Sequence, residues 1–242
     1  MTPMAEAESE VVDRFAWQRI AKMIDHTNLR PEATAEQIAR LCTEAEKFGF
    51  GAVMVNTSYV ALACSKLVGK AVTVGTVVGF PLGAVVASAK RFEAEEGLRL
   101  GAREFDMVLN IGALKSGDRQ QVQSDIRAVA ETVHGKSALL KVILETGLLT
   151  DEEKKLACEL SVEAGADFVK TSTGFLGGGA TVADVALIRR IVGPHVGVKA
   201  SGGIRTAADA KAMIEAGANR LGTSNGVKIV QELLAMSPHM TL

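Results

Sequence analysis

Short apolar runs alternate with longer amphipathic stretches along the whole chain, and no linker-like segment separates them. The short runs are rich in β-branched residues and almost continuously apolar, which is typical of parallel strands that are covered on both faces. Eight strands are predicted, at residues 23–25, 52–56, 72–79, 104–110, 139–145, 168–171, 196–200 and 221–223. Amphipathic helices are predicted between them, at residues 34–48, 88–100, 118–133, 150–164, 182–192 and 206–216.

A glycine recurs where a predicted helix gives way to a strand. Gly49, Gly101, Gly165 and Gly217 precede the second, fourth, sixth and eighth strands, at intervals of about two βα units. We expect each of them to adopt the left-handed conformation that ends many helices. The recurrence indicates that one βα unit is repeated along the chain.

Eight βα units in 242 residues predict an α/β fold, a single-domain (β/α)8 TIM barrel. The alternative is an open, doubly wound sheet, which usually has a glycine-rich dinucleotide or Walker loop after its first strand. Here that strand continues into Asp25-His26-Thr27-Asn28-Leu29, which is neither. The predicted organisation is an N-terminal extension with an extra helix at residues 1–21, the barrel at 22–236 and a C-terminal tail at 237–242.

Composition and charge exclude several classes of partner. The chain has 27 basic and 28 acidic residues, one Trp and one Tyr, so it offers neither the basic field nor the stacking surface that nucleic acids require. The uncharged segment 71–89 approaches the length of a membrane span, but four Gly or Pro residues interrupt it. We predict a buried strand and a loop there, and therefore no membrane association.

Cysteine and histidine usage predicts a cytoplasmic protein without a cofactor. Cys42, Cys64 and Cys158 form no CxxC pair, which argues against a disulfide framework or a thiolate metal site. The acidic, polar first 13 residues lack the features of a signal peptide. The four histidines show no metal-ligand spacing. No metal or other cofactor is expected.

Three lysines lie within apolar strands. Lys141, Lys170 and Lys199 belong to the fifth, sixth and seventh strands, and lysine is seldom buried unless it is paired or functional. Lys170 and Lys199 lead directly into loops of Gly, Ser and Thr, which favours a functional role. For Lys141 a structural ion pair is an equally good interpretation.

Two lysines on adjacent strands can activate one another. A free lysine has a pKa near 10.4, and a second ammonium group about 6 Å away lowers it by about two units at an effective dielectric of about 20. A neutral amine at ordinary pH is a nucleophile that forms Schiff bases with carbonyl compounds. The pair therefore predicts a Schiff-base enzyme, although the spacing does not decide which lysine is the nucleophile.

Carboxylates accompany these lysines. Asp106 lies within an apolar strand and Asp25 ends the first strand, and carbon–carbon cleavage through an imine needs a proton relay of this kind. Glu145 could be a second member of the relay or the ion-pair partner of Lys141, and we favour the partner role. Asp106 and Asp25 are alternative partners of Lys141.

Glycine-rich loops follow the sixth, seventh and eighth strands. In barrels, the loops after strands seven and eight form a phosphate site from backbone N–H groups at a helix N-terminus. The alternative is that these glycines serve only tight turns. The predicted phosphate-binding residues are Gly174, Gly202, Gly203, Ile204, Arg205, Gly222, Thr223 and Ser224. The loop at 174–179 could also close over a substrate.

The chain resembles the deoxyribose-phosphate aldolase family. Six segments carry the resemblance in order and together span about residues 22–234: IDHTNL at 24–29, FDMVLNIG at 105–112, LKVILET at 140–146, FVKTSTGF at 168–175, VKASGGIRT at 198–206 and RLGTS at 220–224. The resemblance implies a cytoplasmic class I aldolase, a lyase of deoxyribonucleotide and carbohydrate degradation. Such an enzyme reversibly cleaves 2-deoxy-D-ribose 5-phosphate to acetaldehyde and D-glyceraldehyde 3-phosphate.

The resemblance also implies roles for individual residues. Lys170 would form the imine, Lys199 would perturb its pKa, and Asp106 would relay protons together with Lys199 and a water molecule. Supporting roles fall to Asp25, Thr27, Asn28, Lys141, Glu145 and Thr173. A homodimer is the family expectation, and the partners would be sugar phosphates and aldehydes. A Schiff-base aldolase for another sugar phosphate and a non-catalytic sugar-phosphate-binding barrel are the alternatives.

Overall fold

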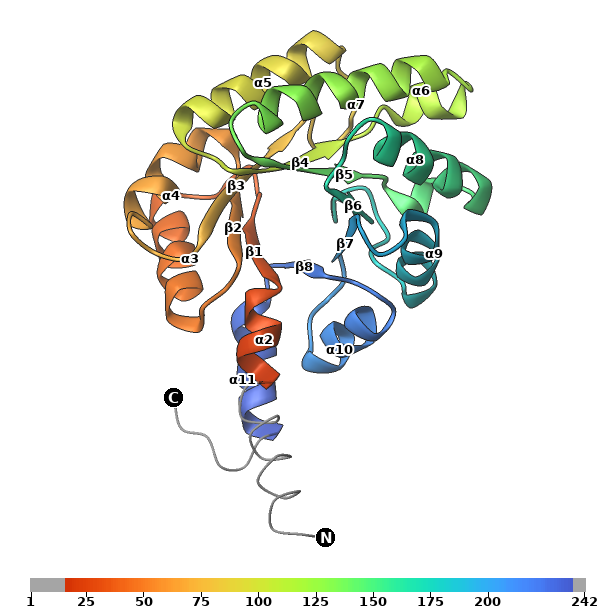
Figure 1. Cartoon of the computed structure of the whole chain (residues 1–242). Coiled ribbons are helices and arrows are strands. Elements are labelled where there is room, and N and C mark those ends of the chain that lie inside the picture. Colours follow the sequence, from red (N-terminus) through yellow and green to blue (C-terminus); the bar gives the residue numbers. More distant parts are fainter. Residues whose placement is uncertain (1–15, 237–242) are drawn as a thin grey trace, which may run out of the picture.

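Eight parallel strands close into a barrel in the order of the sequence (Figure 1). The computed structural model describes residues 16–236. The strands are β1 (Ile24–Asn28), β2 (Ala52–Val55), β3 (Thr73–Val78), β4 (Glu104–Val108), β5 (Leu139–Ile143), β6 (Phe168–Lys170), β7 (Gly197–Ser201) and β8 (Arg220–Thr223). β1 pairs with both β2 and β8, which closes the ring. The predicted TIM barrel is confirmed, and the open doubly wound sheet is excluded.

Helices surround this barrel (Figure 1). They are α2 (Ala16–Lys22), α3 (Ala35–Phe48), α4 (Val60–Lys66), α5 (Ala87–Leu100), α6 (Ile111–Lys115), α7 (Arg119–His134), α8 (Asp151–Glu163), α9 (Val182–Val192), α10 (Ala207–Glu215) and α11 (Gly226–Met236). The six predicted helices correspond to α3, α5, α7, α8, α9 and α10, within one residue at each end. No helix in the described range is long and apolar enough to cross a membrane.

Local sequence signals explain several helix ends. Thr34, Thr150 and Thr206 begin α3, α8 and α10 with capping boxes, in which the threonine hydroxyl accepts a backbone N–H and a side chain three residues on accepts the threonine N–H. Gly49, Gly101, Gly165 and Gly217 all have positive φ, between 68° and 111°. The predicted left-handed glycine before each even-numbered strand is confirmed.

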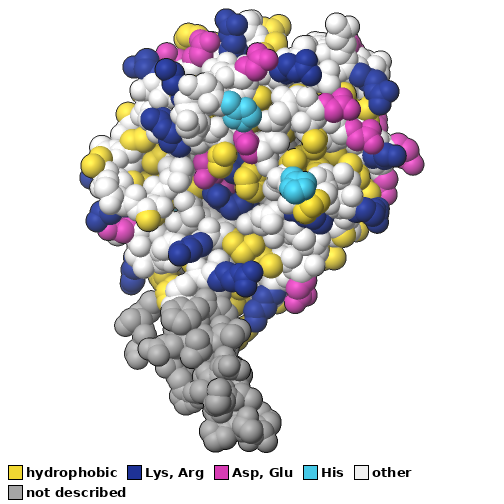
Figure 2. Space-filling model, viewed as in Figure 1, with side chains coloured by type: hydrophobic (Ala, Val, Ile, Leu, Met, Phe, Trp, Pro, Cys, Tyr) yellow, Lys and Arg dark blue, Asp and Glu magenta, His cyan; other side chains and the backbone are white. Residues whose placement is uncertain are grey.

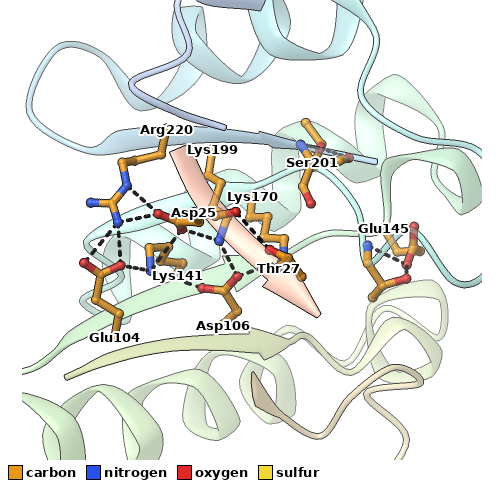
Figure 3. Close-up of polar contacts among 12 residues, drawn as sticks. Asp25, Thr27, Glu104, Asp106, Lys141, Glu145, Lys170, Lys199, Ser201 and Arg220 are labelled. Carbon is orange, nitrogen blue, oxygen red and sulfur yellow. Dashed lines mark hydrogen bonds and ion pairs between the residues drawn. The ribbon is translucent and has the colours of Figure 1, made fainter. Parts of the chain in front are cut away.

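Alternating residues of the strands lie in two different environments, the apolar core beneath the helices and the interior of the barrel. Phe105, Leu140 and Val198 belong to the apolar core beneath the helices. Asp106 and Lys141, each next in sequence to one of these, are fully buried and lie among other charged side chains inside the barrel (Figure 3). The period of two in a strand therefore places the apolar residues outside the barrel wall and the charged residues within it.

One described helix precedes the βα alternation. The helix α2 packs alongside the C-terminal helix α11 (Figure 1), and its Trp17 and Ile20 contact the apolar core. An extra helix was predicted within the N-terminal extension at residues 1–21, and α2 (Ala16–Lys22) lies at the end of that range. Residues 1–15 and the predicted tail at 237–242 lie outside the described residues.

Candidate active site

Lys170 and Lys199 lie side by side in the barrel and share one acceptor. They are direct partners in the register of β6 and β7, and their Nζ atoms donate to the same oxygen of Asp106, Oδ2, at 2.8 and 2.6 Å (Figure 3). Lys170 is 3% exposed, whereas Lys199 and Asp106 are fully buried. The structure therefore brings together the three residues that the sequence predicts to be catalytic.

Lys141 enters the same cluster from β5. Its Nζ donates to Glu104 at 2.5 Å and to Asp106 Oδ1 at 3.2 Å, and it lies 3.7 Å from a carboxylate oxygen of Asp25. Two of the partners considered from the sequence, Asp106 and Asp25, are confirmed. The favoured partner, Glu145, is wrong, and Glu104 takes that place.

Asp25 links the cluster to β8. Its Oδ2 lies 2.5 Å from Lys199 Nζ, and its Oδ1 accepts from the guanidinium of Arg220. Arg220 also donates to Glu104, at 2.8 Å. Glu104 and Arg220 were not among the site residues predicted from the sequence. Strand alternation could have found Glu104, because it lies two residues before Asp106 and so shares its face.

Opposite charges keep most of this cluster ionised. Burial alone would raise the pKa of Asp106, but the ammonium groups of Lys141, Lys170 and Lys199 hold that pKa well below its usual range. The pKa of Asp25 is lowered in the same way, against the effect of burial, by Lys199, Lys141 and Arg220. Burial would lower the pKa of Lys141, yet the surrounding carboxylates, with Asp106 the strongest, raise it.

Lys170 differs from Lys141 because its pKa is lowered, to about 8. Burial is the largest cause, and the ammonium groups of Lys199 and Lys141 add to it, while the carboxylate of Asp106 opposes them. The expected activation by a second lysine is therefore present, but desolvation by the barrel contributes more. At pH 7 a much larger fraction of Lys170 is the neutral, nucleophilic amine than of a lysine with the ordinary pKa of 10.5.

A cavity of about 730 Å³ opens beyond the carboxyl ends of the strands. Among the residues that line it are Lys170, Thr27, Asn28 and Thr173, together with all eight predicted phosphate-binding residues: Gly174, Gly202, Gly203, Ile204, Arg205, Gly222, Thr223 and Ser224. Lys199, Lys141 and Asp106 do not line it. Of the three clustered lysines, Lys170 is thus the one that lines the cavity among the described residues.

The two glycine-rich loops after β7 and β8 are joined by a hydrogen bond. Thr223 Oγ1 donates to the carbonyl of Ile204 at 2.7 Å and accepts from Asn225 N at 2.9 Å. Gly202 and Gly203 have φ of 89° and 80°, which turns the backbone sharply between β7 and α10. The last loop leads into α11, so its backbone lies at a helix N-terminus, which is a favourable place for an anion.

Glu145 lies outside the charged cluster because the strand ends before it. β5 stops at Ile143, and Glu145 has φ 58° and ψ 61°, a left-handed conformation that is uncommon for a residue with a side chain. Its Oε2 accepts from both the backbone N–H and the hydroxyl of Thr173. Thr173 Oγ1 in turn accepts from Phe175 N at 3.1 Å. Glu145 therefore shapes the loop that follows Lys170.

That loop also touches its neighbours at the rim of the cavity. Ala180 N donates to Gly202 O at 3.0 Å, and the Phe175 ring packs edge-on against Phe80, with centroids 5.1 Å apart. The loop thus contacts the segments that follow β3 and β7. Its closure over a substrate stays a prediction.

Comparison with known proteins places the chain in a family. The model of the DeoC/LacD family aldolases matches residues 19–232. The chain belongs to the DeoC/LacD aldolase family. It is 58% identical over 211 residues to a deoxyribose-phosphate aldolase of Listeria monocytogenes, covering 87% of this chain and 94% of that protein. It is 57% identical over 218 residues to deoxyribose-phosphate aldolase 1 of Bacillus licheniformis, covering 90% and 97%.

A solved structure supports the same assignment. The chain superimposes on the tetrameric deoxyribose phosphate aldolase from Aeropyrum pernix with a TM-score of 0.86 and 33% identity, covering 94% of this chain and 97% of that one. The resemblance noted in the sequence motifs is confirmed. As a DeoC/LacD-family aldolase, the chain combines a cavity-lining lysine of lowered pKa, a set of buried carboxylates and a cavity within one barrel.

Proposed function

We propose that this aldolase cleaves 2-deoxy-D-ribose 5-phosphate reversibly to acetaldehyde and D-glyceraldehyde 3-phosphate, with Lys170 as the nucleophile. The observation that carries this proposal is that Lys170 combines a lowered pKa with a position on the cavity wall. Lys199 is fully buried and does not line the cavity. The spacing of the two lysines left the choice between them open, and the geometry supports Lys170, the residue to which the family resemblance gives this role.

The proposed reaction begins with attack of the neutral Lys170 amine on the C1 aldehyde of the open-chain sugar. Loss of water gives an iminium ion, which accepts the electron pair of the C2–C3 bond when the C3 hydroxyl loses its proton. Glyceraldehyde 3-phosphate leaves, and the remaining enamine takes a proton at C2. Water then hydrolyses the acetaldehyde imine and restores the Lys170 amine.

Asp106 and Lys199 are proposed to move the protons. The carboxylate of Asp106 is ionised, and we propose that it accepts a proton transiently through a water molecule and returns it to the enamine. Lys199 stays paired with Asp106 and Asp25 and supplies positive charge beside the imine. Lys141 and Asp25 are proposed to hold these two groups in place.

The loops after β7 and β8 are proposed to bind the substrate phosphate. The carboxylate of Asp209 accepts hydrogen bonds from the backbone N–H groups of Arg205 and Thr206 at 3.0 Å each. Those two N–H groups are therefore occupied in capping α10. The backbone of Gly202, Gly203 and Ser224 is left as the proposed donor set, and the Arg205 side chain adds a positive charge at the cavity. Thr27, Asn28 and Thr173 are proposed to contact the sugar.

A substrate comparison tests this function. The purified protein is incubated with each sugar in turn, acetaldehyde is measured by coupled reduction with NADH, and glyceraldehyde 3-phosphate is measured in a separate coupled assay that also detects cleavage of a ketose phosphate. We expect acetaldehyde from 2-deoxyribose 5-phosphate, much less from unphosphorylated 2-deoxyribose, and none from a ketose phosphate such as fructose 6-phosphate. Cleavage of the ketose phosphate alone would indicate an aldolase for another sugar, and no cleavage of any of them would indicate a binding protein.

Assembly and location are also proposals. We propose a homodimer, because Leu82, Val86 and Phe92 are 59, 69 and 61% exposed on a short segment around the start of α5 and could be covered by a second copy. Light scattering in solution would test this against a monomer or a tetramer. We propose that the enzyme acts in the cytoplasm, because its three cysteines are free thiols.

A further inference from the structure

Seven charged side chains form one continuous ion network inside the barrel. Each is joined to another member by an ion pair of 3.7 Å or less. They come from six of the eight strands. The members are Asp25, Glu104, Asp106, Lys141, Lys170, Lys199 and Arg220, and we call them the barrel network (Figure 3).

The barrel network extends from one end of the barrel to the other. From Lys170 it passes to Asp106 at 2.8 Å, to Lys141 at 3.2 Å, to Glu104 at 2.5 Å and to Arg220 at 2.8 Å. Glu104 and Arg220 are the first residues of β4 and β8, so they lie at the end of the barrel opposite the cavity. The side chain of Arg220 is 16% exposed there, and Figure 2, which looks onto the N-terminal ends of the strands, shows acidic and basic side chains near the centre of this face.

The network contains one more cation than it has carboxylates. Its four basic groups face three acidic groups, and an uncompensated charge is costly in a buried site. Arginine does not release its proton in proteins, and the pKa of Lys141 is raised by the carboxylates around it. The pKa of Lys170, by contrast, is lowered. Lys199 pairs with two carboxylates, Asp25 and Asp106, at 2.5 and 2.6 Å, whereas Lys170 pairs with Asp106 alone at 2.8 Å. Lys170 is thus the cation with the fewest ion pairs, and we infer that the excess positive charge is relieved when it becomes neutral.

We propose that Glu104 and Arg220 set the protonation of Lys170 from the far end of the barrel, through the charge balance of the network. This inference rests on the proposed function for the role of Lys170. Neither residue lines the cavity, so both act on the reaction only through the charges between them and Lys170. They are positioning residues.

The charged neighbours of Lys170, Glu104 and Arg220 determine how a substitution changes the net charge around Lys170. Lys170 is faced by Asp106 of β4, Lys141 of β5 and Lys199 of β7. Glu104 is faced by Lys141 and Arg220, and Arg220 is faced by Glu104 and by Asp25 of β1. Removing Glu104 thus adds to the positive excess, whereas removing Arg220 abolishes it.

The pKa of Lys170 can be read directly by NMR titration of protein labelled with [ε-¹³C]lysine, with the resonance assigned by its loss in Lys170→Met. A charge about 10 Å away at an effective dielectric of about 20 shifts a pKa by about one unit. We expect Glu104→Gln to lower the pKa of Lys170 by about one unit and Arg220→Gln to raise it by about one unit. The double variant should return close to the wild-type value.

Two controls separate charge from structure. Arg220→Lys keeps the charge and should leave the pKa of Lys170 unchanged. Asp125→Asn breaks another buried ion pair, that of Lys90 with Asp125 at 2.5 Å between α5 and α7, and should destabilise the fold without moving the pKa. If Glu104→Gln does not fold, the contrast between Arg220→Gln and Arg220→Lys still decides the question.

Shifts of opposite sign in Glu104→Gln and Arg220→Gln support the proposal. Shifts of the same sign, or a Lys170 pKa that is unchanged in both variants, overturn it. The titration does not depend on catalysis, so the two proposals can fail separately. If the protein does not cleave 2-deoxyribose 5-phosphate but the opposite shifts are seen, the network inference stands and the proposed function is wrong.

Discussion

Lys170 and Lys199 are neighbours across β6 and β7, and both donate to Oδ2 of Asp106. Only Lys170 of the two lines the cavity. Its side chain is therefore accessible to a molecule in the cavity, whereas Lys199 contacts only the charged side chains around it. This asymmetry explains how two identical side chains in adjacent strands can have different roles.

Loss of the Lys199 charge should reduce the reactivity of Lys170. In Lys199→Met the repulsion that lowers the pKa of Lys170 is gone, so less of the neutral amine is present at pH 7. We expect kcat/KM to fall by about 10²- to 10⁴-fold, with the acid limb of its pH profile displaced to higher pH. Steady-state kinetics between pH 6 and 10 would measure both effects. A uniform loss at every pH would instead indicate that Lys199 acts only as a proton donor.

Lys170 should make the folded state less stable below pH 8. Its pKa is about 8 in the folded protein against an ordinary value of 10.5, so between these values the unfolded chain binds more protons. The free energy of unfolding therefore rises with pH between about 8 and 10.5. Below pH 8 the destabilisation caused by protonated Lys170 is fully present. We expect Lys170→Met to raise the free energy of unfolding at pH 7 by about 1–3 kcal/mol.

Urea denaturation at several pH values would measure this effect. The advantage of Lys170→Met over the wild type should shrink as the pH rises from about 8 to 10.5. Lys155→Met is a suitable control, because the side chain of Lys155 is 65% exposed on α8. A Lys170→Met variant less stable than the wild type at pH 7 would contradict the electrostatic account.

Glu145 should matter for the hydrogen bonds it accepts and not for its charge. Glu145→Gln keeps an acceptor for the N–H and hydroxyl of Thr173, so we expect it to retain most of the activity. Glu145→Ala leaves the buried N–H of Thr173 without that acceptor, which costs about 1–3 kcal/mol and should lower kcat at least tenfold. Kinetics and thermal unfolding of both variants would test this, and inactivation by Glu145→Gln would restore Glu145 as a member of the proton relay.

Gly202 should be needed for phosphate binding. Its φ is 89°, and a Cβ there would lie 3.0 Å from the Cα of Gly179 in the neighbouring loop. We expect Gly202→Ala to raise the KM for 2-deoxyribose 5-phosphate about tenfold while leaving the slow cleavage of 2-deoxyribose little changed. Gly69→Ala is the matched control, because Gly69 also has positive φ, 72°, but has open space around it. An equal effect on both substrates would mean that Gly202 supports the fold and not the phosphate site.

The sequence predicts the barrel well because its signals are local. Strand alternation, threonine caps and left-handed glycines such as Gly49 and Gly217 act within a few residues. The buried Lys170 and Lys199 were also recognisable, since charged residues inside apolar strands are rare. The glycine-rich loops could be assigned because barrels place the ends of all strands at one edge.

Other features of the site depend on contacts that the sequence does not encode locally. Glu145 lies four residues after Lys141, and in a continuous strand the two would share a face. The left-handed backbone at Glu145 breaks that alternation and turns its side chain to Thr173. Arg220 and Glu104 are 116 residues apart and resemble ordinary charges at the start of a strand until the barrel closes and brings them together.

The central claim is that Lys170, and not Lys199, forms the covalent intermediate. Incubation with acetaldehyde followed by borohydride reduction fixes any imine as a stable two-carbon adduct, which peptide mass mapping can place on a single residue. The account predicts the adduct on Lys170, its absence in Lys170→Ala, and its presence in Lys199→Met at a pH high enough to deprotonate Lys170. No adduct in the wild-type protein, or an adduct on Lys199, would contradict it.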